Sequence, residues 1–109
     1  MTASEFCRHA IAMHRETMAT IRADIGAEAI PSEETLRKCR IKASFLLLTV
    51  KKMESYISNG FVYAPPIEIS KQIARRILNN TKEMVLTIVE MEAAILTEKA
   101  KRALEKDKL

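Results

Sequence analysis

The most constraining feature of the chain is a run of seven apolar residues spaced alternately three and four positions apart. They are Leu36, Cys39, Ala43, Leu46, Val50, Met53 and Ile57. This spacing places them on one face of an α-helix, which turns once every 3.6 residues. Ser32 suits the N-cap, Glu33 and Glu34 suit the positively polarised first turn, and Asn59-Gly60 suits the C-terminal stop. We therefore predict a helix that begins at Glu33 and ends at Asn59-Gly60. A second apolar row on this helix predicts burial on more than one side; it comprises Ile41, Phe45, Leu48 and Tyr56.

A second helix is predicted near the N-terminus. Ser4 suits its N-cap, and its apolar residues recur at helical spacing until Gly26; they are Cys7, Ile11, Met18, Ile21 and Ile25. We expect this helix to run from about Glu5 to Ile25. His14 occupies a position in the apolar seam, and we expect it to be a hydrogen-bonded core residue, with Ser44 as a candidate partner.

The last helix is predicted to begin at Pro66 or Ser70 and to continue to about Lys106. One apolar face contains Ile73, Ile77, Met84, Ile88, Met91 and Ile95, and a second row widens it with Leu78, Val85, Val89 and Leu96. Unbroken, this helix is ~55 Å long, against ~40 Å for the helix before it. The alternative is a break near Asn80, where Asn80-Thr81-Lys82-Glu83 resembles a capping box. We favour the unbroken helix.

These elements predict one all-α domain over residues 1–109, an antiparallel three-helix bundle that becomes four helices if the last one breaks. Two glycines and three prolines leave too few turn residues for a β-sandwich or barrel. Residues 98–109 are predicted to be a charged tail that frays or overhangs. Because the last two helices are apolar over more than one stripe, we expect the chain to form a homodimer.

The cysteines indicate a reducing compartment. Cys7 and Cys39 form no CxxC pair, and in a helical hairpin they lie ~18 Å apart along the axis, too far for a disulfide. The longest aliphatic stretch, residues 45–50, is far shorter than the ~20 residues of a membrane span. We therefore expect a soluble, cytoplasmic protein with no membrane partner.

Two features are candidate partner-binding surfaces. The first is basic: Arg8, Arg15 and Arg22 form one stripe along the first helix, and the next helix adds Arg37, Lys38 and Arg40. Such a surface binds phosphates or an acidic protein, unless glutamates 83, 90, 92 and 98 of the last helix neutralise it internally. The second is an apolar loop, residues 61–66, in which Phe61 and Tyr63 join Tyr56 as interface anchors or as a plug over the bundle end.

The leading functional hypothesis is a non-catalytic protein-interaction module, such as a small adaptor, inhibitor or regulator. The alternative is a nucleic-acid-associated regulator that uses the basic side of the first two helices. Less favoured is a bundle that holds a metal or haem through His14, because no second histidine is spaced to share a ligand face with it. The chain has no glycine-rich phosphate loop and no paired seam carboxylates, so we expect no enzyme activity and no cofactor.

Overall fold

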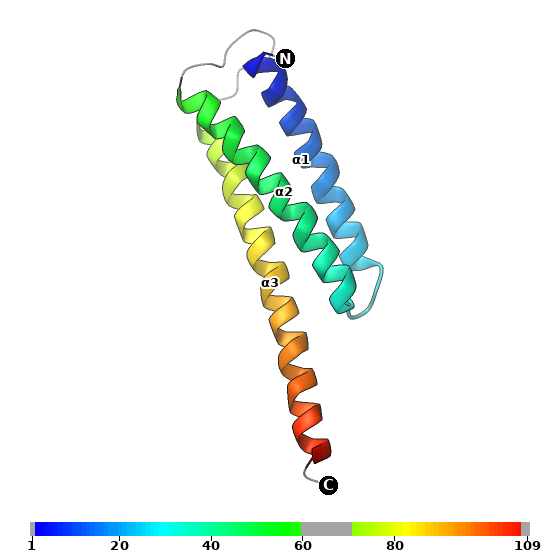
Figure 1. The fold of residues 1–109 in the computed structure, drawn as a ribbon. Helices are drawn as coiled ribbons and strands as arrows, with labels where there is room; N and C mark the ends of the chain where they lie inside the picture. The colour runs from blue at the N-terminus through cyan, green and yellow to red at the C-terminus, as the bar shows by residue number, and fades with distance from the viewer. Residues whose placement is uncertain (1, 60–70, 108–109) are drawn as a thin grey trace.

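The computed structural model describes residues 2–59 and 71–107, and it shows three helices that run up, down and up (Figure 1). Helix α1 is Ala3–Gly26, α2 is Glu33–Ser58 and α3 is Lys71–Asp107. The described residues contain no strand. The predicted all-α, three-helix architecture is therefore confirmed.

Side-chain caps fix where α1 and α2 begin. Thr2, rather than Ser4, is the N-cap of α1: its hydroxyl accepts from the Glu5 amide, and the Glu5 carboxylate accepts from the Thr2 amide. The helix therefore begins two residues earlier than predicted. Ser32 caps α2 as predicted, by accepting from the Thr35 amide. Glu28 accepts from both Ser32 and Thr35, which ties the connection to the new helix.

Helix α3 is continuous, and the break considered near Asn80 is absent. Thr81 is fully buried, and its hydroxyl donates to the Ile77 carbonyl 2.8 Å away, so its polar group is satisfied within the helix. The helix then extends well past the first turn of α2, as Figure 1 shows in orange and red. The predicted overhang is therefore helical through Asp107.

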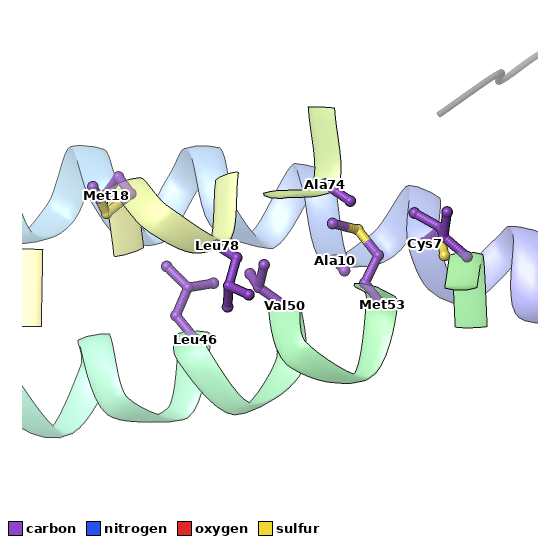
Figure 2. Close-up of a cluster of buried hydrophobic side chains, with 9 residues drawn as sticks. Cys7, Ala10, Met18, Leu46, Val50, Met53, Ala74 and Leu78 are labelled. Atoms are coloured by element: carbon purple, nitrogen blue, oxygen red, sulfur yellow. The ribbon is translucent and has the colours of Figure 1, made fainter. Parts of the chain in front are cut away.

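The core consists of two apolar clusters, and α2 contributes to both. In the first, Leu78 of α3 lies close to Leu46 and Val50 of α2, and Cys7 of α1 lies at the other end of the cluster, beyond Met53 (Figure 2). The second joins Ile21, Leu36, Cys39, Ala43 and Ile88. All seven residues of the α2 seam are buried as predicted. Cys7 and Cys39 are buried free thiols in different clusters, as the hairpin argument required.

The second apolar row predicted on α2 is exposed in the single chain except for Tyr56, which is half-buried. Ile41, Phe45 and Leu48 are 49%, 68% and 64% exposed. At 100° per residue, these three positions lie roughly 180° around the helix from the buried seam.

The buried face of α3 also differs from the prediction. Its fully buried positions are Ala74, Leu78, Thr81 and Ile88. Ile73, Val89 and Leu96 are exposed instead. The rest of the predicted face is confirmed, because Leu78 and Ile88 are buried and the other members are half-buried against the core: Ile77, Met84, Val85, Met91 and Ile95.

The bundle is open on one side. Helix α2 packs against both other helices, whereas no Cα atom of α1 comes within 8 Å of one in α3. The three helices therefore leave a groove between α1 and α3.

Candidate functional site: the groove between α1 and α3

The groove between α1 and α3 has a volume of about 630 Å³. Its apolar lining consists of Ile11 and Met18 from α1 and Ile77 and Met84 from α3. These four side chains are buried or half-buried and belong to, or pack against, the first core cluster. The apolar bottom of the groove is thus continuous with the core.

The α1 wall of the groove is basic. Arg15 and Arg22, two members of the predicted arginine stripe, line it, and both are exposed. Neither guanidinium has a carboxylate within 4.0 Å among the described residues. Arg8 continues the stripe but does not line the groove. Two of the three predicted arginines are therefore placed together at a concave surface, with their charges unpaired.

The α3 wall carries the opposite charge. Glu83 lines it beside Asn80 and Thr87, and Glu83 forms no ion pair within the described part of the chain. The groove thus has a cationic edge and an anionic edge that flank one apolar strip. Such a distribution favours a ligand with charges of both signs rather than a simple anion.

His14 lies in the groove as a neutral, unsatisfied group. Its Nε2 is buried without a hydrogen-bond partner, and the predicted partner Ser44 is exposed on α2, so the predicted hydrogen bond to Ser44 is absent. Burial, reinforced by the charge of Arg22, lowers the pKa of His14 below its usual 6.5. The imidazole therefore lines the groove, while its Nε2 atom is shielded from solvent.

Metal binding finds no support in the described residues. No group of three or more His, Cys, Asp or Glu side chains within residues 2–59 and 71–107 is placed to hold a metal ion. Burial raises the pKa of both the Cys7 and the Cys39 thiol, which disfavours the thiolate that a metal requires.

Three of the six basic residues on α2 are paired with carboxylates, whereas Arg37, Lys51 and Lys52 have no ion pair among the described residues. Lys38 lies 3.4 Å from Glu34, Arg40 2.7 Å from Glu92 and Lys42 3.0 Å from Asp24. Only one of these three pairs uses a glutamate of α3, so most of the neutralisation comes from α1 and from α2 itself.

The predicted aromatic anchors are only partly placed by the structure. Tyr56 is half-buried and packs edge-to-face on Phe6, with ring centroids 5.3 Å apart, and Lys52 lies over both rings. Tyr56 therefore joins α2 to the start of α1. Phe61, Tyr63 and the rest of the predicted loop lie outside the described residues.

The α3 wall was not predicted as a site. Its members Ile77, Asn80, Met84 and Thr87 recur three and four residues apart, which is the spacing of one helix face. That spacing was visible in the sequence, but nothing local showed that α1 would stay apart from this face.

None of the described helices has an apolar stretch of the length needed to span a bilayer. Comparison of the chain with protein-family models, curated proteins and solved structures found no match. The functional argument therefore rests on the groove itself.

Proposed function

We propose that this protein is a non-catalytic, cytoplasmic interaction module that binds an amphipathic helix of a partner protein in the groove between α1 and α3. The observation that carries the proposal is the pair of unpaired arginines, Arg15 and Arg22, beside an open apolar strip. Surface arginines alone are ordinary; arginines at the edge of an open apolar groove are typical of helix-binding sites.

The shape of the groove favours a helix as the occupant. Both walls run antiparallel to α2 and hence parallel to each other (Figure 1). A fourth helix placed between them completes a four-helix bundle and covers the half-buried side chains Ile11, Ile77 and Met84, whereas Met18 is already buried. Burial of this apolar surface supplies the main driving force for binding.

The charges specify the partner helix further. The edge of the partner helix that faces Arg15 and Arg22 carries two Asp or Glu residues seven positions apart. Its opposite edge carries Lys or Arg, which faces Glu83.

Affinity capture from cells with three forms of the chain tests the proposal. The wild type and Arg37→Glu should both retain the partner, whereas Arg15→Glu combined with Arg22→Glu should lose it. Arg37 is the matched control because it is an exposed, unpaired arginine outside the groove. A synthetic peptide of the captured helix should then show the same order of affinities by fluorescence anisotropy. Equal capture by all three forms would contradict the proposal.

The homodimer predicted from surplus apolar surface is also part of this proposal. Its support is the exposed apolar row Ile41, Phe45 and Leu48 on α2, together with Leu86, Val89 and Leu96 on α3. The groove lies elsewhere, so a dimer through these residues leaves it open to a partner.

A further inference from the structure

Helix α3 carries a second apolar seam that no part of the described chain covers. Its members are spaced alternately three and four residues apart and are all exposed: Leu86, Val89, Ala93, Leu96, Ala100 and Ala103. Leu86 and Leu96 are 58% and 54% exposed, which is high for leucines at regular helical spacing. Alternating three- and four-residue spacing is the pattern by which two helices pack along their length.

This seam is separate from the two faces of α3 already described. The face toward α2 contains Ala74, Leu78 and Ile88, and the face toward the groove contains Ile77 and Met84. At 100° per residue, the seam lies roughly a quarter-turn from the α2 face, on the side away from the groove. Lys99 pairs with Glu33 at the start of α2. The seam continues beyond this pair into the overhang, the part of α3 from Lys99 to Asp107.

We propose that this seam packs antiparallel against α3 of a second copy of the chain. In the register that aligns the two seams, Leu86 faces Ala103 of the partner subunit and Val89 faces Ala100 of the partner subunit. Ala93 faces Leu96 of the partner subunit, and the two-fold axis repeats all three contacts. This inference rests on the homodimer in the proposed function, but not on the groove or on its ligand.

The sizes of the side chains favour the antiparallel arrangement. Every large residue then faces an alanine, so each layer holds one large and one small side chain and the helices approach evenly. A parallel pair in register stacks leucine on leucine and alanine on alanine, which alternates crowded layers with empty ones.

The charges of α3 favour the same arrangement. Between Met84 and Glu98 the helix has no Lys or Arg, and its charged residues there are Glu90 and Glu92. The overhang is mainly basic, with Lys99, Lys101, Arg102 and Lys106. An antiparallel pair places the overhang of each copy against the acidic stretch of the other, with Lys101 within about 3 Å of axial rise of Glu90 of the partner subunit. A parallel pair places like charges together.

The first test is the mass of the protein by light scattering at about 50 µM, a concentration that detects dimers of micromolar Kd. We expect twice the mass of the chain for the wild type and a twofold drop for Val89→Glu combined with Leu96→Glu. Ala94→Glu is the matched control, because it adds a glutamate at an exposed position off the seam and should leave the dimer intact. Circular dichroism should show all three folded, since the replaced side chains are exposed. A monomeric wild type, or a dimer that survives the double substitution, would overturn the proposal.

The second test determines the orientation of the two helices. A spin label on Glu105→Cys points away from the seam, and the buried native thiols Cys7 and Cys39 resist labelling. In the antiparallel register position 105 faces position 84, so the two labels are more than about 30 Å apart by the rise per residue alone, whereas a parallel pair holds them roughly 20–25 Å apart across the two helices. A short distance in pulsed electron paramagnetic resonance would exclude the antiparallel dimer.

Discussion

Arg40 Nη1 lies 2.7 Å from Glu92 Oε2 and joins the first half of α2 to the middle of α3. The Glu92 side chain is only 12% exposed, and its other oxygen, Oε1, is buried without a hydrogen-bond partner. Among the described residues, Arg40 is therefore the only basic side chain within 4.0 Å of the Glu92 carboxylate.

Replacing Arg40 should destabilise the protein because it leaves the Glu92 carboxylate buried and unpaired. We expect Arg40→Ala to lower the free energy of unfolding by about 1–3 kcal/mol, less than for a fully buried pair because Arg40 is 41% exposed. Urea unfolding measures this change. Lys38→Ala, which removes the exposed pair with Glu34, is the control and should cost less than about 0.5 kcal/mol.

Two leucines on α2 should respond very differently to truncation. Leu46 is 2% exposed and Leu48 is 64% exposed. We expect Leu46→Ala to lower the free energy of unfolding by about 2–4 kcal/mol, through lost burial and a residual cavity. Leu48→Ala should cost less than about 1 kcal/mol when the protein is dilute enough to be monomeric, because the side chain is largely in water in the single chain. Equal losses in urea unfolding would mean that Leu48 is buried in solution, for example by a second chain.

The same two leucines show how far the sequence determines the fold. Leu46 belongs to the α2 seam, in which every position at alternating three- and four-residue spacing is apolar. Its burial was therefore predictable from the spacing alone. Leu48 belongs to an apolar row that was predicted to be buried, yet hydrophobicity does not show how many neighbours a helix has. The sequence of a helix specifies which of its faces is most apolar. How many of its faces are buried depends on segments that are distant in the sequence.

The groove shows a second limit of the same kind. The arginine stripe, His14 in the seam and the unbroken α3 were all predicted from the sequence. The separation of α1 from α3 was not, because it depends on how both helices pack on α2. Nor was the unpaired state of Nε2 of His14, which depends on which atoms of the packed helices surround the imidazole.

The stability of the protein should fall with decreasing pH because of His14. Its pKa is lowered in the folded state, so below the unfolded value of 6.5 the unfolded chain binds the proton more readily than the folded one. The contribution of His14 to the free energy of unfolding is therefore fully present above pH 6.5. It is lost as the pH falls through the pKa of His14 in the folded protein. The measurement is the urea midpoint between pH 8 and pH 5, over which His14→Leu should flatten the decline.

His9→Gln is the control for that experiment. His9 is exposed on the same helix, so its replacement should leave the pH dependence unchanged. If the urea midpoint of His14→Leu fell with decreasing pH as steeply as that of the wild type, the pH dependence would come from other groups.

The protein should not bind nucleic acid through α2, despite its formal net charge of +4. Lys38, Arg40 and Lys42 are each paired with a carboxylate that phosphate binding must displace, so only Arg37, Lys51 and Lys52 of the six basic residues on α2 are without an ion pair among the described residues. We therefore expect no retarded band when 30-base-pair DNA or a single-stranded RNA is titrated with the protein at about 50 mM salt, where electrostatic binding is strong. Arg40→Glu and Lys42→Glu should leave that result unchanged. Retardation that weakens steeply with added salt and disappears in these variants would instead favour a nucleic-acid-associated regulator.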